Sequence, residues 1–202
     1  MTRQSNLNNT KEALRHHARR LFARHGYDGV SMRDLADAVG IQQSGIYNHF
    51  ASKQILLVDL MVVYMERVMA ELQAEVSNHT DPVSKLKAFV QFTVIDHINC
   101  PDDVFLAFME LRSLENPGLT KLLALRDAYE TVLRDILSEG IRSRLFNVTD
   151  LDIATRALLA MLSGVTVWYK EDGPLGREKI ADVYVQLVLQ SVGATDQRSP
   201  ST

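Results

Sequence analysis

The chain has 202 residues, of which 46% are hydrophobic and 23% charged, and its net charge at pH 7 is −3. This composition is typical of a globular protein with a sizeable core, and no apolar run reaches the roughly eighteen residues that predict a transmembrane helix. Residues 1–6 lack the apolar stretch of a secretory signal. The single cysteine, Cys100, cannot form an internal disulfide, so we expect a cytoplasmic protein with no membrane partner.

The charge is distributed unevenly along the chain. Residues 1–55 contain eight Lys or Arg and four Asp or Glu, a net charge of +4, whereas the remaining residues carry a net charge of −7. A basic N-terminal head on an acidic body indicates a polyanionic partner for the head alone.

Apolar residues recur at spacings of three and four along the chain, which predicts an all-α protein of about nine helices. The first helix is expected between a cap at Asn9 and Gly26, the second between Ser31 and Gly40, and the third over residues 42–50. Further helices are expected over residues 52–77, 82–99, 101–115, 118–144, 150–170 and 177–192. The chain is expected to divide into a domain of short helices over residues 8–55, a domain of longer helices over 56–192, and a disordered tail over 193–202.

The second and third helices form a helix-turn-helix pattern, two short helices joined by a tight turn that contains a glycine. Gly40 can adopt the left-handed backbone conformation of such a turn. Ile41, Ile46 and Phe50 have the spacing to pack between the helices, which leaves the polar side chains of the third helix exposed.

These polar side chains suit a DNA groove, because glutamine can bond an adenine edge, serine can bond several bases, and a glycine permits close approach. Arginine, tyrosine, histidine and lysine at the rim can reach phosphates. The candidate DNA-binding residues are Arg33, Gln42, Gln43, Ser44, Gly45, Tyr47, His49 and Lys53. On the first helix, Lys11, Arg15 and Arg19 recur every four residues and are expected to form a basic stripe for the same partner.

The stretch ARRLFARHGYDGVSMRDLADAVGIQQSGIYNHFASKQILL resembles the DNA-binding domain of TetR-family transcriptional regulators. The likeness extends over about residues 8–60, and the matching features are Phe22, Gly26-Tyr27, Ser31 with Arg33, Leu35-Ala36, Val39-Gly40-Ile41, Tyr47 with Phe50, and Ser52-Lys53 followed by Leu56. The family commonly has a basic residue at the position of Gln43 and a threonine near Gly45, so the operator sequence cannot be transferred from it.

The resemblance implies a homodimeric repressor that binds a double-stranded operator and is released by a small-molecule effector. It implies that residues 8–55 are the helix-turn-helix DNA-binding domain and that residues 56–192 are the ligand-binding and dimerisation domain. By analogy with the family, the last two helices pair with their copies; the alternative is that they are ordinary core helices. The expected dimer residues are Leu158, Leu162, Val165, Trp168, Val183, Tyr184 and Leu187.

The segment VWYKEDGPLGREKIADVYVQLVL is similar to the same region of repressors of fatty-acid and steroid catabolism, which respond to acyl-CoA thioesters. An acyl-CoA or a related hydrophobic acid is therefore the expected effector, with aromatic residues lining a tunnel and an arginine at the anionic head group. The candidate ligand residues are Phe89, Phe92, Phe105, Phe108, Met109, Arg112, Tyr129 and Arg156.

Other functions remain open in the sequence. A sensor of cationic drugs would use Asp96, Glu110 or Glu115 in the same cavity, and a helical protein-interaction module would explain the acidic body but not the basic head. No phosphate loop, nucleophile elbow or metal-binding histidine pair is present, so we expect no catalytic residue, no metal and no cofactor.

Overall fold

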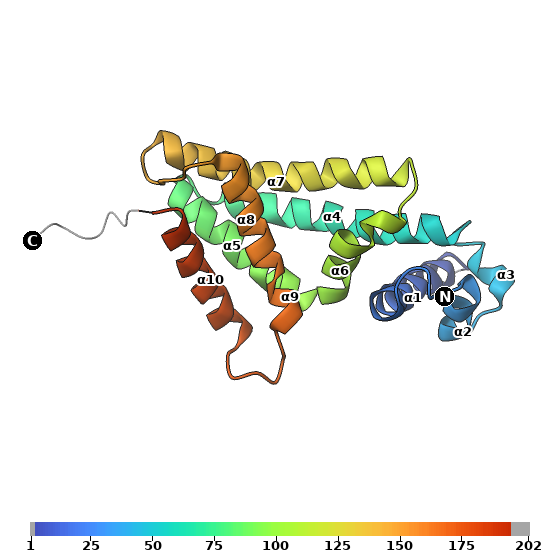
Figure 1. Ribbon diagram of the computed structural model, residues 1–202. Helices are drawn as coiled ribbons and strands as arrows, with labels where there is room; N and C mark the ends of the chain where they lie inside the picture. The colour runs from blue at the N-terminus through green and yellow to red at the C-terminus, as the bar shows by residue number, and fades with distance from the viewer. Residues whose placement is uncertain (1–2, 195–202) are drawn as a thin grey trace, which may run out of the picture. The chain divides into compact units, whose positions relative to one another are not determined.

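A computed structural model describes residues 3–194 of the chain, with side chains from residue 9 onward. Helices form the regular structure of this part (Figure 1), which confirms the all-α prediction. In chain order they are α1 (Arg3–His25), α2 (Met32–Val39), α3 (Gln43–Ile46), α4 (Lys53–Ser77), α5 (Pro82–Asn99), α6 (Pro101–Met109), the 3₁₀ helix η1 (Glu110–Ser113), α7 (Gly118–Arg142), α8 (Leu151–Ser163), α9 (Val165–Trp168) and α10 (Arg177–Ser191). Residues 195–202 of the predicted tail lie outside the described part.

Several helix boundaries differ from the sequence expectation. Helix α1 begins at Arg3, so Asn9 lies inside the helix and does not cap it. The third helix stops at Ile46, because the amides of Asn48 and His49 bond carbonyls three residues back and tighten the chain into turns. The helix expected over residues 101–115 becomes 3₁₀ at Glu110, and the one expected over 150–170 is interrupted at Gly164.

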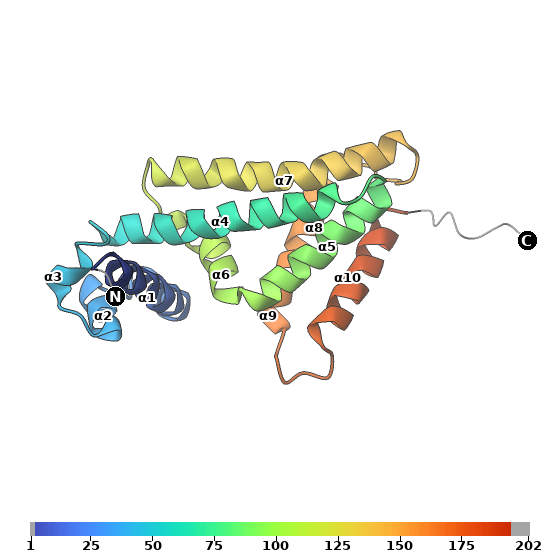
Figure 2. The same cartoon turned by 180° about the vertical axis from the view of Figure 1, so that it is seen from behind.

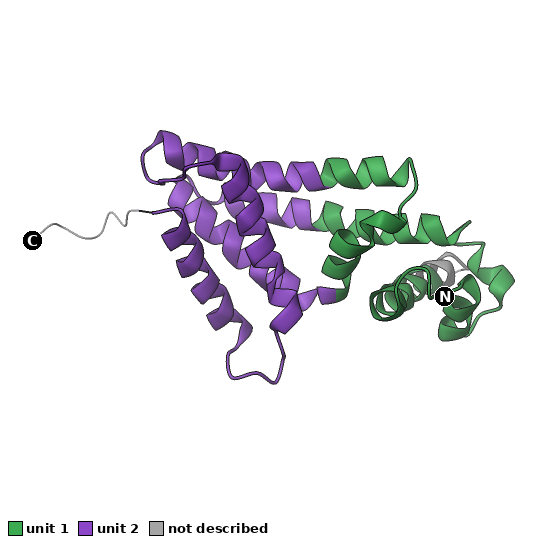
Figure 3. Ribbon diagram, in the orientation of Figure 1, with its two compact units in different colours: residues 1–67, 102–125 green, residues 68–101, 126–202 purple. Residues whose placement is uncertain are grey.

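The chain divides into two compact units (Figure 3), residues 1–67 with 102–125 and residues 68–101 with 126–202. We call them unit 1 and unit 2. Unit 1 includes the first part of α4, α6 from Asp102 onward, η1 and the start of α7. The domain boundary expected at residue 55 stays a prediction.

In unit 1, α1 packs against α2 and α2 packs against α3. The core of this three-helix head includes Leu14 and Phe22 of α1, Leu35 of α2 and Ile46 of α3, all fully buried. Helix α2 is bounded as the sequence predicts. Ser31 and Asp34 form a reciprocal capping box, and Gly40 ends the helix in the left-handed conformation at φ 74°.

In unit 2, α5 is the central helix and packs against α8, α9 and α10. Figures 1 and 2 show α5 and α10 side by side from opposite directions, in agreement with these contacts. Asp81 caps α5 by accepting a hydrogen bond from the amide of Ser84, and Pro82 follows at the first helical position.

Candidate functional site

The outer surface of α3 is polar and exposed. Gln42, Gln43 and Ser44 all reach solvent, whereas Ile46 is fully buried and holds the helix on the head. Gln42 occupies the N-cap position without a side-chain cap hydrogen bond. Its amide group is therefore available to an external partner.

Gly45 has no intramolecular reason to lack a side chain. A Cβ built at this position would meet only the side chain of Ile41, at 3.9 Å, which is an ordinary van der Waals contact. Glycine also weakens a helix by roughly 1 kcal/mol relative to alanine. The free space in front of Gly45 is what close approach of another molecule requires.

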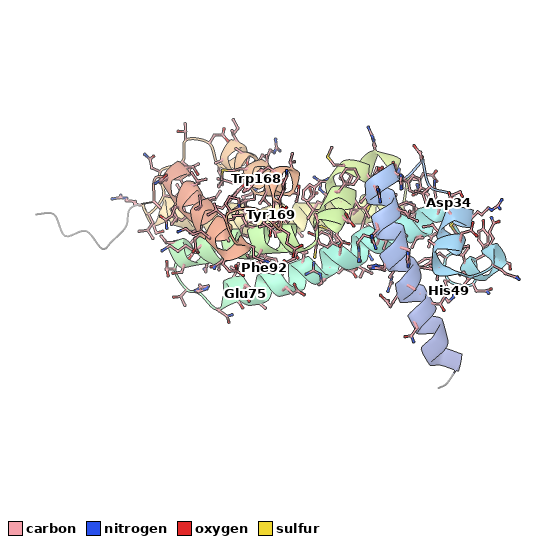
Figure 4. The ribbon with its side chains drawn as sticks, turned by 90° about the horizontal axis from the view of Figure 1, so that it is seen from below. Asp34, His49, Glu75, Phe92, Trp168 and Tyr169 are labelled. Carbon is pink, nitrogen blue, oxygen red and sulfur yellow. The ribbon has the colours of Figure 1, made fainter. Side chains whose placement is uncertain are left out.

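The rim residues of this surface come from three segments. Arg33, in the first turn of α2, is exposed and lies 3.8 Å from its helical neighbour Asp37. Tyr47 is exposed and His49 is half-buried, and Figure 4 labels His49 and Asp34 in this head. The hydrogen bonds from Ser31 lower the pKa of Asp34, so this carboxylate stays ionised near Arg33.

Lys53 differs from its expected role at a phosphate. Its ammonium group donates hydrogen bonds to the carbonyls of Tyr27 at 2.9 Å and Val30 at 3.0 Å, and it lies 4.0 Å from the centre of the Tyr27 ring. Lys53 therefore fastens the start of α4 to the loop between α1 and α2.

The basic stripe of α1 faces the protein and not an external partner. Arg15 donates to both carboxylate oxygens of Asp59 at 2.7 and 2.9 Å, which raises the pKa of Arg15. Lys11 lies 4.0 Å from the same carboxylate. Arg19 donates to Asp103 at 2.6 Å. Arg15 also pairs with Glu12, its neighbour on α1. The stripe expected at the DNA therefore takes part in ion pairs within the protein, two of whose acids, Asp59 and Asp103, are far away in the sequence.

Polar contacts within unit 1 also connect the head to α6 and η1. The buried carboxylate of Glu110 accepts a hydrogen bond from the amide of Tyr27 at 3.2 Å and another from the hydroxyl of Ser113 at 2.8 Å. Gln54, at the start of α4, donates to the carbonyl of Ser113. With the Arg19–Asp103 pair, these contacts mean that a displacement of α6 or η1 would pull on α1, the α1–α2 loop and α4.

The candidate ligand residues are divided between the two units. In unit 2, Phe89 and Tyr129 are buried with their ring centres 5.5 Å apart, and Phe92, labelled in Figure 4, is half-buried. The Tyr129 hydroxyl shares a hydrogen bond of 2.7 Å with Thr93, and burial raises the pKa of Tyr129. These residues form a mixed aromatic and hydroxyl cluster on α5 and α7.

The remaining ligand candidates are more exposed. In unit 1, Phe108 is half-buried, whereas Phe105, Met109 and Arg112 are exposed. The change to 3₁₀ geometry at Glu110 removes Arg112 from the continuous α-helical face on which the sequence placed it. In unit 2, Arg156 is exposed and lies 3.8 Å from the carboxylate of Glu130.

Arg126 is a cationic residue that the sequence reasoning missed. It lies on α7 three residues before Tyr129 and is half-buried, and burial lowers the pKa of its guanidinium despite the opposing influence of Asp127 and Glu130. Its spacing of one helical turn from Tyr129 was the signal available in the sequence. A partly desolvated arginine one helical turn from Tyr129 is a stronger candidate for an anionic head group than the exposed Arg156.

The predicted dimer residues fall into two sets. Leu158, Leu162, Val165 and Tyr184 are buried within the single chain. Trp168, Val183 and Leu187 are exposed, with the rings of Trp168 and Tyr184 stacked at 6.4 Å. The sequence reasoning missed two further exposed residues, Ile153 at 68% and Val167 at 87% exposure. We call the exposed apolar residues of α8, α9 and α10 the exposed apolar surface of unit 2: Ile153, Val167, Trp168, Val183 and Leu187. Leu175, in the segment before α10, is also 48% exposed.

One segment, Leu151–Trp168, is apolar and long enough to cross a membrane by length and composition alone, with a mean hydropathy of 1.3. Only 22% of it is buried in the single chain. The segment contains Asp152, which is ion-paired with Arg134 of α7, and Arg156. These charges and the interruption at Gly164 favour a surface covered by protein over one in lipid.

Known protein families match both the N-terminal and the C-terminal part of the chain. The model of bacterial regulatory proteins of the tetR family matches residues 14–60, and that of the tetracyclin repressor-like C-terminal domain matches residues 79–192. The transcriptional repressor KstR2 of Mycobacterium tuberculosis is 23% identical over 189 residues, covering 92% of this chain and 94% of that protein.

Solved structures share the fold. A tetR-family regulatory protein from Rhodococcus RHA1 superposes with a TM-score of 0.86 at 24% identity, covering 93% of this chain and 98% of the other. The structure of AibR in complex with isovaleryl coenzyme A and operator DNA superposes with a TM-score of 0.82 at 23% identity, covering 92% of this chain and 100% of the other.

Proposed function

The chain belongs to the TetR family of bacterial regulatory proteins, and from that premise we propose that it is a cytoplasmic repressor that binds a palindromic operator as a homodimer and is released by a hydrophobic acidic effector. The observation that carries the DNA-binding part is α3, a short helix held by buried Ile46 that exposes Gln42, Gln43 and Ser44 beside an uncrowded Gly45. Such a helix fits the major groove.

Fluorescence anisotropy with labelled duplexes at two salt concentrations tests DNA binding. We expect binding to random duplex at low ionic strength and a steep loss as salt is raised, because displaced counterions drive the association. A helical protein-interaction module without DNA function would not bind the duplex at either salt concentration.

The exposed apolar surface of unit 2 supports the homodimer. Its members Ile153, Val167, Trp168, Val183 and Leu187 come from α8, α9 and α10, and large apolar patches on soluble proteins mark association sites. A second copy of the same surface is self-complementary under two-fold symmetry. This symmetry would present two copies of α3 to two half-sites of a palindrome.

Release by an effector needs a route from the effector to the head. The contacts of Asp103 with Arg19 and of Glu110 with the amide of Tyr27 supply the part of that route that lies within unit 1, since α6 carries Asp103 and η1 carries Glu110. An effector that shifts α6 would strain these contacts and reorient the head. The Asp103→Asn variant should therefore keep its operator affinity within a few-fold but respond less to the effector, as measured by anisotropy with and without that compound.

For the effector we propose an acyl-CoA or a related hydrophobic acid. The similar protein AibR has been captured with isovaleryl coenzyme A, and the KstR2 of known structure is a ketosteroid regulator. In this chain the aromatic pair Phe89 and Tyr129 offers apolar contacts, and the partly desolvated Arg126 offers a cation.

Calorimetry with a panel of CoA thioesters and a panel of cationic dyes separates this effector from a cationic drug. We expect heat from at least one thioester, with at least tenfold weaker binding in Arg126→Gln, because a charge-assisted contact is worth about 1.5–3 kcal/mol. Of the acids that a cationic drug would use, Glu110 is occupied by two hydrogen bonds and Glu115 is exposed, which leaves the buried Asp96. Binding of dyes but no thioester would refute the acyl-CoA proposal.

A further inference from the structure

Helix α1 carries a second basic stripe that the DNA-binding and effector proposals do not use. Arg20 and Arg24 follow Arg15 and Arg19 by five residues each, which places them about 140° further around the helix. The first pair is neutralised by Asp59 and Asp103. Arg20 and Arg24 are exposed, and neither forms an ion pair within residues 3–194.

These two arginines line a groove in unit 1 with a volume of about 450 Å³. Its walls also contain His17 and His25 of α1, Ala38 of α2 and Asp102 at the start of α6. The volume lies within the range of small-molecule sites. Four cationic or protonatable side chains therefore converge on one concavity.

The charges in the groove are not balanced by the protein. Asp102 is the acidic residue that lines the groove, and among the described residues it forms no ion pair with an arginine. Its neighbour Asp103 is ion-paired with Arg19. Like charges one helical turn apart, as Arg20 and Arg24 are, repel each other. The helix dipole accounts for Arg24 and His25 in the last turn of α1, but it does not account for Arg20, which lies more than one turn from the end. An anionic ligand would relieve this repulsion.

The groove is distinct from the surface that would read DNA. Ala38 and Arg33 are five residues apart on α2, so they point about 140° apart around that helix. None of the residues of α3 lines the groove. A duplex against α3 and Arg33 would therefore leave this concavity open to a small molecule.

We propose that the groove binds a small molecule with two or more phosphate groups, of the nucleoside di- or triphosphate class. Arg20 and Arg24 bind the phosphates, because a guanidinium group matches phosphate geometry with two parallel hydrogen bonds. Asp102 accepts a hydrogen bond from a hydroxyl or amino group of the same ligand, which a nucleoside supplies and inorganic polyphosphate does not. This site is independent of the acyl-CoA site proposed in the body.

Calorimetry on the full chain with ATP and with inorganic tripolyphosphate tests this site. We expect both to bind, with ATP the tighter, and binding of both to weaken at least tenfold in Arg20→Gln/Arg24→Gln. The matched control is Arg142→Gln/Arg144→Gln, which removes two exposed arginines, one at the last position of α7 and one two residues beyond it, and should bind both ligands like the wild type. Asp102→Asn should bind tripolyphosphate a few-fold more tightly, because a repulsive charge is removed, and should lose the preference for ATP.

Two results would overturn the proposal. Equal losses in the two double variants would mean that the anion responds to net charge only. The second result is that neither ATP nor tripolyphosphate binds, and that the salt dependence of duplex binding falls by about two counterions in Arg20→Gln/Arg24→Gln. It would mean that Arg20 and Arg24 contact DNA phosphates instead. Circular dichroism of each variant verifies that the helices remain folded.

Discussion

The outer surface of α3 and the exposed apolar surface of unit 2 differ in the free-energy cost of exposing their side chains to water. Water satisfies Gln42, Gln43 and Ser44, so their exposure costs the free chain nothing. Val167 and Trp168 are 87% and 52% exposed, and each loses stabilisation that burial would supply. Exposure of apolar side chains therefore supports the proposed dimer on energetic grounds, whereas the argument for α3 rests on the combination of polar groups with an uncrowded Gly45.

The largest effect is expected from charging the apolar surface. Val183→Glu/Leu187→Glu should convert the dimer to a monomer and lower operator affinity at least a hundredfold, because two carboxylates cannot be buried without partners. Sedimentation velocity and anisotropy measure the two quantities. Leu123→Glu is the control, since Leu123 is also exposed but belongs to unit 1. A dimer that persists in the double variant would mean that α10 is not in the interface.

A change inside unit 2 should affect folding and leave DNA recognition intact. Gly140 is buried, and a Cβ there would lie 1.9 Å from the ring of Phe146. Gly140→Ala should therefore lower the free energy of unfolding by about 3 kcal/mol, because the ring must shift in a packed core. Urea denaturation measures the loss. Gly176→Ala, at a site where the nearest atom is 3.7 Å away, should cost at most about 1 kcal/mol, because only the preference for glycine at the N-cap of α10 is lost.

In the head, the sharpest test separates base reading from phosphate contact. Gln43→Ala should weaken operator binding by about 2 kcal/mol if the amide bonds a base edge, with affinity for random duplex unchanged. Anisotropy with both duplexes gives the difference. Equal losses on the two duplexes would remove Gln43 from base reading and leave it as a backbone contact.

A substitution of Gly45 should change stability and operator affinity in opposite directions. Gly45→Ala should raise the stability of the head by up to about 1 kcal/mol, because alanine favours the helix and the nearest atom allows a Cβ. Operator affinity should nevertheless fall, because the methyl group prevents close approach. Thermal unfolding and anisotropy are both needed. A stabilised variant with full affinity would show that no molecule approaches Gly45 closely.

The smallest effect concerns buried His97 in unit 2, where desolvation lowers the pKa of the imidazole against the opposing influence of Asp96. The unfolded chain takes up this proton near pH 6.5, whereas the folded chain resists it. Stability should therefore fall as the pH drops below about 6.5, by at most about 1.4 kcal/mol per pH unit. Denaturation of wild type and His97→Gln between pH 7.5 and 5.5 measures the difference. Parallel curves would exclude His97 as the source.

The sequence predicts the head well where the signals are local. The Ser31 cap, the left-handed Gly40 and the burial of Ile46 and Phe50 all follow from residues within a few positions of one another. Local signals do not show that the basic stripe of α1 pairs with acids of the protein. The acids that neutralise Arg15 and Arg19 are 44 and 84 residues away, and no spacing rule within α1 identifies them.

In unit 2, the sequence pattern is likewise insufficient to predict which apolar residues are buried. Helical periodicity identifies the stripe that contains Leu158 and Leu162, and both are buried in unit 2. It does not identify which apolar residues of α8 and α9 remain exposed when these helices pack against α5. Ile153 and Val167 were therefore missed. Arg126 was missed because its importance depends on burial, which the pattern of α7 alone does not reveal.

The central claim is that α3 reads duplex DNA as one half of a symmetric pair. Footprinting of the purified full chain on genomic DNA, with the stoichiometry of the isolated site from sedimentation, tests it most directly. We predict protection of two inverted half-sites separated by about one helical turn or a multiple of it, with a whole number of dimers bound. A monomer that protects no sequence at low ionic strength, or one that protects a single half-site alone, would contradict the claim.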